Sequence, residues 1–131
     1  MRALDTNVLV RFVTADNPQQ LERVSALFHE ASEKQETLYV SLPVVLELMW
    51  VLTSTYEVSR DALVAALDQL LSLPFLRFEQ EHCIRDFLKE SLLSRLDLAD
   101  LLVAISGRHA GCTTTLTFDR TAARSPLFTA L

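Results

Sequence analysis

The chain has 131 residues, a length typical of one domain, and half of its residues are apolar, which is enough for one hydrophobic core. It contains only two glycines and four prolines, which argues against a disordered or collagen-like chain. The net charge of −5 comes from 12 basic and 17 acidic residues, so the chain is not an obvious nucleic-acid binder unless some of its acids hold cations.

No apolar run approaches the ~20 residues of a membrane-spanning helix, and the first residues lack the apolar segment of a signal peptide. We therefore expect a soluble, cytoplasmic protein without a membrane partner. The two cysteines, Cys83 and Cys112, have no His or Cys neighbours at metal-binding spacing and form a poor disulfide framework. Both are predicted to be buried thiols.

The first half of the chain is predicted to alternate short strands with helices. A strand over 2–4 ends at Asp5, and a short helix follows over 6–13. The next helix starts after Asn17, a favourable N-cap, with Pro18 at its first position. Further along, the patterns predict a strand over 37–41, an unusually apolar helix over 43–56 and a helix from its cap Ser59 to about Leu73.

The second half continues the alternation. Its patterns predict a strand over 75–79 and an amphipathic helix over 80–94, whose apolar face is formed by Cys83, Phe87, Leu88 and Leu92. They then predict an apolar helix over 97–109 with Gly111 as its C-cap, a β-branched strand over 113–118 and a short edge strand over 127–130. Alternating strands and helices predict an α/β fold with a parallel sheet of four to five strands and helices on both faces. We expect one domain over residues 1–131.

Two carboxylates directly follow predicted strands. Asp5 follows the first strand and Asp119 follows the fourth. Parallel strands end at the same edge of a sheet, where such folds bind ligands, so both acids are predicted to point into one crevice. Helix capping or a turn would also explain an Asp at either position.

Glu47 is the only charged residue in 43–55, and its helical neighbours Trp50 and Val51 are apolar. A helix that is apolar nearly all round is expected to be buried, where a lone carboxylate is costly unless it is paired or bound to a metal. No Lys or Arg lies within four residues of Glu47, although a distant Arg11 could pair with it. A functional carboxylate is the preferred interpretation.

Asp97 and Asp100 are three residues apart and share one face of the predicted helix. Asp97 suits the N-cap, which is a structural role. Asp100 is again a lone charge among apolar residues, so the burial argument applies to it more strongly.

Acids that converge repel one another, so at least one must take a proton or bind a metal. Ligands that are all oxygen suit Mg²⁺ or Mn²⁺ rather than zinc, and two such ions can clamp the oxygens of a phosphoryl transfer. The chain has no Gly-rich phosphate loop and no evident Ser–His–Asp set. Its histidines fall on predicted helices near charged residues and are expected at the surface: His29, His82 and His109.

With these acids in place, the sequence resembles the PIN-domain family, in particular the VapC-type toxins of toxin–antitoxin pairs. The matching segments are LDTNVLVR, SLPVVLELMWVL, DLADLLVAISGRHAGC and TLTFDR, which together span nearly the whole chain in the family's order. The resemblance implies a three-layer fold with sheet order 3-2-1-4-5. It also implies an endoribonuclease that uses Mg²⁺ or Mn²⁺, usually as a homodimer, with a cognate antitoxin as partner.

The resemblance also implies roles for single residues. The principal metal-binding and catalytic acids are Asp5, Glu47, Asp100 and Asp119, and the accessory residues are Asp97, Thr6, Asn7 and Thr117. Many relatives carry a further acid two residues after the TFD aspartate, where this chain has Thr121, so its affinity for a second metal is expected to be lower. Hydrolysis would leave a 5′-phosphate and a 3′-hydroxyl. Candidate RNA-contacting residues near the acids are Arg11, Arg95, Arg120 and Arg124.

Other functions remain alternatives at this stage. A PIN nuclease of housekeeping RNA processing would have the same residues, and a catalytically inactive scaffold is disfavoured because the four principal acids are present. A haloacid dehalogenase-like phosphatase needs a second acid where this chain has Asn7. A non-enzymatic, Mg²⁺-binding receiver-like domain needs a Lys after a late strand, but Lys34 and Lys89, the only lysines, lie in predicted helices.

Overall fold

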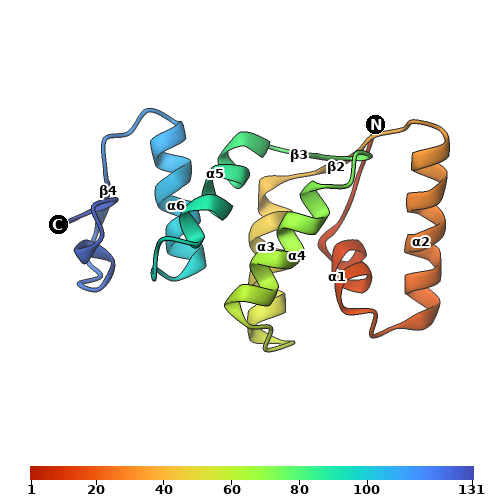
Figure 1. Cartoon of the computed structure of the whole chain (residues 1–131), viewed down its shortest axis with the longest axis horizontal. Coiled ribbons are helices and arrows are strands. Elements are labelled where there is room, and N and C mark those ends of the chain that lie inside the picture. The colour runs from red at the N-terminus through yellow and green to blue at the C-terminus, as the bar shows by residue number, and fades with distance from the viewer. The chain divides into compact units, whose positions relative to one another are not determined.

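The computed structural model describes all residues, 1–131, and the chain folds into two compact units, residues 1–79 and 80–131 (Figure 1). Both units contain helices and parallel strands, so the predicted α/β class is confirmed. None of the helices is both long and apolar enough to cross a membrane.

The first unit contains a three-stranded parallel sheet of order β1-β2-β3. Its elements are β1 (Arg2–Ala3), α1 (Thr6–Thr14), α2 (Pro18–Glu33), β2 (Leu38–Val40), α3 (Leu42–Ser54), α4 (Arg60–Leu71) and β3 (Leu76–Phe78). Leu38 pairs with Leu76 and Val40 with Phe78, and all four side chains are buried. The register therefore places one row of apolar side chains toward the core. The order of the three strands matches the 3-2-1 part of the predicted strand order 3-2-1-4-5.

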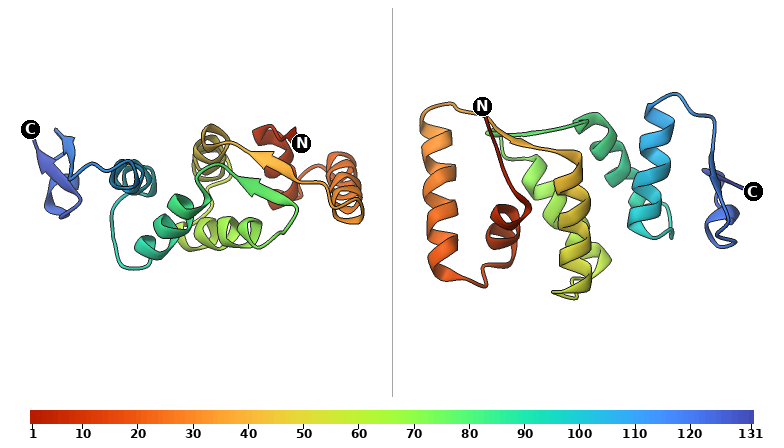
Figure 2. Two further views of the ribbon diagram at one scale, coloured as in Figure 1. Left: turned by 90° about the horizontal axis from the view of Figure 1, so that it is seen from above. Right: turned by 180° about the vertical axis from the view of Figure 1, so that it is seen from behind.

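The helices of the first unit lie on both sides of these strands. Helix α1 packs against α2 and α3, whereas α4 packs against α3 and β3. In the view from above, α1 and α4 lie on opposite sides of the sheet (Figure 2). Parallel strands need such crossover helices, and the helices cover the apolar rows of the strands.

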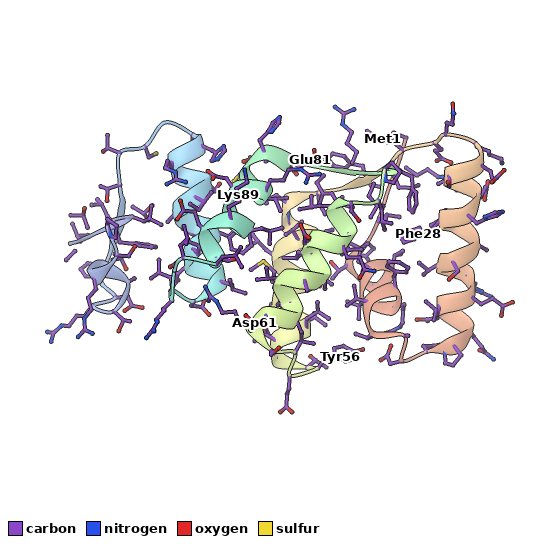
Figure 3. The ribbon with its side chains drawn as sticks, viewed as in Figure 1. Met1, Phe28, Tyr56, Asp61, Glu81 and Lys89 are labelled. Carbon is purple, nitrogen blue, oxygen red and sulfur yellow. The ribbon has the colours of Figure 1, made fainter.

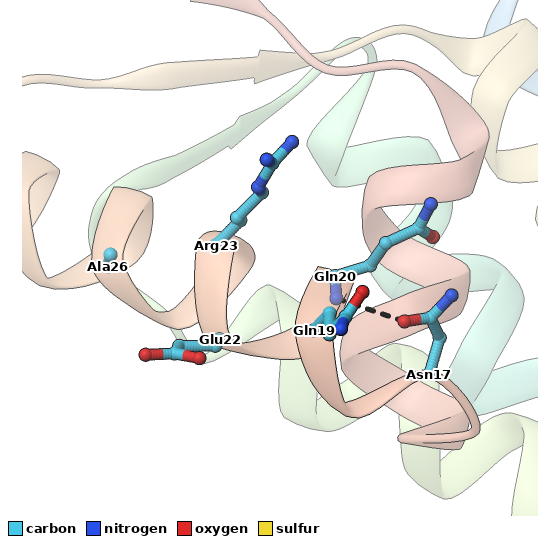
Figure 4. A pocket seen from close by; sticks show the side chains of 6 residues that line it. All are labelled: Asn17, Gln19, Gln20, Glu22, Arg23 and Ala26. Carbon is cyan, nitrogen blue, oxygen red and sulfur yellow. Dashed lines mark hydrogen bonds between the residues drawn. The ribbon is translucent and has the colours of Figure 1, made fainter.

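Two of the predicted helix starts are confirmed by their caps. The side chain of Asn17 accepts a hydrogen bond from the Gln20 amide at 3.1 Å, beside a shallow hollow lined by polar residues of α2 (Figure 4). Ser59 caps α4 in the same way through the Ala62 amide. Helix α3 begins at Leu42 rather than at the predicted Pro43, because the first-turn amides of a helix have no intrahelical partner and proline is tolerated there.

An aromatic cluster joins the helices of the first unit to the start of β3. Phe28 is a residue of α2 (Figure 3). The centroid of its ring lies 5.0 Å from that of Phe12 and 5.1 Å from that of Phe75. Phe28 is 5% exposed. Just beyond the C-terminal end of α1, the Tyr56 hydroxyl donates to Asp16 at 2.6 Å, which connects the loop after α1 to the turn after α3.

The second unit contains α5 (Glu81–Ser91), α6 (Leu98–His109), β4 (Thr115–Thr117), the 3₁₀ turn η1 (Ala122–Arg124) and β5 (Phe128–Ala130). Helices α5 and α6 pack through Ile84, Phe87, Leu101 and Ile105, none of which is exposed. Strands β4 and β5 are parallel neighbours, as the predicted order requires. The single domain and the adjacency of β1 and β4 in that order stay predictions.

Several local expectations for the second unit are corrected. Helix α5 ends at Ser91 rather than at residue 94, so Leu92 is exposed instead of lying on the apolar face. Gly111 follows the C-cap, which is Ala110, and adopts a φ of +94° that favours glycine. Cys83 is buried as predicted, whereas Cys112 is exposed because it lies in the loop that follows this turn.

The aromatic cluster gives a prediction for stability. Phe28→Ala should lower the free energy of unfolding by about 3–5 kcal/mol, because it removes a buried ring and leaves a cavity between Phe12 and Phe75. Urea denaturation followed by circular dichroism would measure this change. The adjacent exposed residue serves as the control, since His29→Ala should change stability by no more than about 0.5 kcal/mol. Equal effects of the two substitutions would contradict the proposed core.

Candidate active site

Asp5 lies at the start of α1, two residues after β1 ends. Its backbone is extended, and its Oδ1 accepts a hydrogen bond from the Thr6 amide at 2.9 Å. The capping role that the sequence left open is therefore present. The side chain is nevertheless exposed, and a carboxylate has more acceptor positions than this one hydrogen bond uses.

A buried hydroxyl links the start of α1 to the middle of α3. The Thr6 side chain is 2% exposed, and its Oγ1 donates to Oε2 of Glu47 at 2.8 Å. Hydrogen bonds to ionised groups are among the stronger ones, so this contact fixes the orientation of the Glu47 carboxylate. The first unit thus brings Glu47 beside the residue that follows Asp5.

The predicted burial of Glu47 is wrong. Helix α3 buries Val45, Leu48, Met49 and Leu52, whereas Glu47 is exposed together with Leu46 and Trp50, which are 40% and 67% exposed. A helix that is apolar on all sides does not reveal which of its faces meets the core, and Glu47 lies outside the buried face.

The suggested ion pair between Glu47 and Arg11 is also absent. Arg11 forms a salt bridge with Asp16 at 3.3 Å and contacts the Tyr56 hydroxyl at 3.2 Å. Its guanidinium is engaged in the connection between the two turns, which weakens its candidacy as an RNA contact.

The second unit brings three aspartates to one pocket, which Glu90 also lines. Asp97, Asp100 and Asp119 line a pocket of about 890 Å³. Asp100, in the first turn of α6, is half-buried. Burial raises the pKa of Asp100 above its usual value, and the negative charges of Asp97 and Asp119 raise it further. The partial burial argued from the sequence is thus confirmed for Asp100.

Asp119 is held by the backbone on both sides. Its Oδ1 accepts from the amides of Thr121 and Ala122 at 2.8 and 3.2 Å, and its own amide donates to Oγ1 of Thr117 at 2.9 Å. Thr117 is therefore a positioning residue for Asp119. The turn that the carboxylate stabilises continues into η1.

Asp97 occupies the N-cap position of α6, but its side chain makes no capping hydrogen bond. Its backbone carbonyl accepts from the Leu101 amide instead. Asp97 is therefore the N-cap of α6 as predicted, although its side chain does not take part in the cap. The exposed carboxylate faces the same pocket as Asp100.

The basic candidates differ in their placement. Arg95 and Arg124 line the acidic pocket, whereas Arg120 is exposed without lining it. Arg108, which the sequence reasoning did not single out, also lines the pocket. Its guanidinium is paired with Asp86 at 2.9 Å and with Glu90 at 3.4 Å, so its charge is already balanced.

The donors fit a hard divalent cation, because every candidate ligand is a carboxylate oxygen. No group of three or more His, Cys, Asp or Glu side chains is arranged to hold a metal ion within either unit by itself. The structure brings Glu47 to Thr6 in the first unit and joins Asp97, Asp100 and Asp119 in the second. The convergence of all four principal acids in one site stays a prediction.

Comparisons with known proteins extend across both units. The family model of the PIN domain matches residues 2–126. The chain is also similar to a VapC ribonuclease of Aquifex aeolicus (strain VF5), with 26% identity over 120 residues, which cover 92% of this chain and 88% of that protein. Because the family model covers nearly the whole chain and includes all the candidate acids, this protein belongs to the PIN domain family.

Proposed function

We propose that the chain is a metal-dependent endoribonuclease that hydrolyses RNA phosphodiester bonds. The observation that carries this proposal is the pocket lined by Asp97, Asp100 and Asp119, in which Asp100 is held at an electrostatic cost. Burial and the neighbouring carboxylates disfavour the ionised form of Asp100 until a cation or a proton joins the cluster. Membership in the PIN family and the likeness to a VapC ribonuclease support RNA as the substrate.

In this proposal Asp5, Glu47, Asp100 and Asp119 hold Mg²⁺ or Mn²⁺, and Asp97 is an accessory acid. When bound, such a cation lowers the pKa of water and stabilises the charge that develops on a phosphate. Thr6 orients Glu47 through its hydroxyl, and Thr117 fixes the backbone that presents Asp119. The adjacent Asn7 is exposed and is proposed to act beside Asp5.

The expected chemistry is in-line attack of water on phosphorus, which leaves a 5′-phosphate and a 3′-hydroxyl. No side chain needs to serve as the nucleophile. Arg95 and Arg124 lie at the pocket and are placed to contact the phosphates, since a guanidinium matches phosphate geometry. Arg120 and Arg11 are weaker candidates, because the first does not line the pocket and the second is paired with Asp16.

We further propose a toxin role, with a cognate antitoxin as protein partner and a homodimer as the assembled form. The resemblance to VapC-type toxins and the name of the similar ribonuclease support the first two parts. The alternative within the same family is a nuclease of housekeeping RNA processing.

Loss of one principal acid should abolish cleavage. Asp5→Asn should lower the rate of metal-dependent cleavage of single-stranded RNA on the order of 100-fold or more, because it removes a charged ligand. The asparagine retains an oxygen for the Thr6 amide, so the cap of α1 is kept. Product analysis on gels, with and without EDTA, gives the readout.

The matched control for that experiment is Asp68→Asn, because Asp68 is an exposed acid within α4. It should leave the rate unchanged. Equal activity of wild type and Asp5→Asn, or cleavage that persists in EDTA, would refute the proposed nuclease.

The repulsion at Asp100 predicts an effect on stability. Its pKa is raised, so the folded state binds that proton more tightly than the unfolded chain does. The stabilising contribution is complete below the ordinary value of 3.8 and is lost as the pH rises through the higher pKa of the folded state. Without metal, Asp100→Asn should therefore be more stable than wild type at pH 7, and the difference should vanish below pH 3.8.

Urea denaturation in EDTA, at pH 7 and below pH 3.8, would measure the difference in stability between Asp100→Asn and wild type. Asp68→Asn serves as the control. Added Mn²⁺ should raise the melting temperature of the wild type more than that of Asp100→Asn, because only the wild type retains this ligand. A variant that is less stable than wild type at pH 7 in EDTA would show that Asp100 has a structural role.

The toxin role predicts growth arrest. Induced expression of the wild-type chain in a bacterial host should stop growth, whereas Asp100→Asn at equal abundance should not, because the arrest requires cleavage. Co-expression of the small protein encoded by an adjacent upstream reading frame should restore growth. Unimpaired growth with active wild-type enzyme would favour the housekeeping role.

A further inference from the structure

The pocket of the second unit has an apolar wall that metal binding does not explain. Besides the carboxylates, this pocket of about 890 Å³ is lined by apolar side chains, namely those of Leu93, Leu96, Ala122, Pro126 and Leu127. Pockets of a few hundred to about 1,000 Å³ with mixed apolar and polar walls are typical of small-molecule sites. The space is larger than a cation with its waters requires.

Leu93 is the most exposed part of this wall. It lies just after the end of α5 and is 86% exposed. Its neighbour Leu92 is 77% exposed but does not line the pocket. Exposed apolar groups are informative when they adjoin a polar site, because a ligand can then cover them and gain from their burial.

Two arginine side chains line the same pocket as the apolar wall. Arg95 and Arg124 line the pocket, and no salt bridge occupies either of them. Arg108, on the same pocket, is neutralised by Asp86 and Glu90. The guanidinium groups of Arg95 and Arg124 are therefore available to pair with an anionic group on the ligand.

The wall is held in place before any ligand binds. The Leu127 amide donates to Oγ of Ser125 at 3.2 Å, and the Leu127 carbonyl accepts from the Thr115 amide at 3.1 Å. The hydrogen bonds from the amides of Thr121 and Ala122 to Asp119 fix the other end of the same segment. A preformed wall avoids the entropic cost of ordering a loop on binding.

We propose that this apolar wall is a subsite for one unpaired nucleobase beside the phosphate that is cleaved. The proposal deepens the proposed ribonuclease function and rests on it for the identity of the ligand. A nucleotide combines an anionic phosphate for Arg95 or Arg124 with a flat apolar face for Leu93 and Leu127. A base in a duplex is stacked and paired, so only single-stranded or looped RNA can present that face.

The test is a nuclear magnetic resonance titration of the ¹⁵N-labelled full chain in Mg²⁺, with adenosine 5′-monophosphate and ribose 5-phosphate as the two probes. Both probes carry the phosphate, and only one carries a base. The nucleotide should bind at least threefold more tightly, and it should shift the amide signals of residues 93–96, 121–125 and 127. Equal affinity of the two probes, or shifts confined to other residues, would overturn the subsite.

Two neighbouring leucines provide a matched pair of variants. Leu93→Ser should remove the preference for the nucleotide, whereas Leu92→Ser should retain it, because only Leu93 lines the pocket. Both side chains are exposed, so neither change should impair folding. Arg124→Gln should lower the affinity of the protein for both probes by a similar factor. Loss of the preference in both leucine variants would count against the assigned wall.

This outcome is separable from that of the proposed function, because binding is measured without turnover. A nucleotide preference in a protein that does not cleave RNA would refute the nuclease alone. Cleavage that depends on Asp5, combined with no preference between the probes, would refute the base subsite alone.

Discussion

Three aspartates and Glu90 line one pocket of the second unit, and the crowding of charge around Asp100 is the constraint on which the interpretation of the structure depends. Asp100 is half-buried and faces the charges of Asp97 and Asp119, so its pKa is raised. Burial and the two neighbouring charges both disfavour the ionised form of Asp100 in the folded chain. Stability alone does not account for such an arrangement, whereas a cation or a proton relieves it.

The acids are held in place by different local hydrogen bonds. Asp119 is fixed by two backbone amides, Asp5 by the amide of Thr6, and Glu47 by the hydroxyl of Thr6. Each contact uses one oxygen of a carboxylate and leaves acceptor capacity on the group. The sequence motif around Asp5 thus has two structural consequences, because Thr6 both begins α1 and orients a residue on α3.

Much of the fold was predictable because its signals are local. Asn17 and Ser59 are good N-caps, and both cap their helices as expected. The β-branched run that precedes Asp119 forms β4. Asp100 was recognised as a lone charge among apolar residues, and its partial burial follows from that pattern.

The errors arose where tertiary packing decides the outcome. The apolar sequence of α3 does not state which face meets the core, and Glu47 proved to be exposed. Leu92 was assigned to a buried face because its spacing continued the helical period, but α5 ends one residue earlier. The wall around Leu93 and Leu127 joins segments that are separated in sequence, so no local pattern could reveal it.

The division of the acids has a consequence for the proposed enzyme. Asp5 and Glu47 belong to the first unit, Asp100 and Asp119 to the second, and neither unit by itself holds a group of three acids arranged for a metal. The family model nevertheless spans both units with one match. The proposed quartet therefore requires the full chain, because each unit contains only two of its four acids.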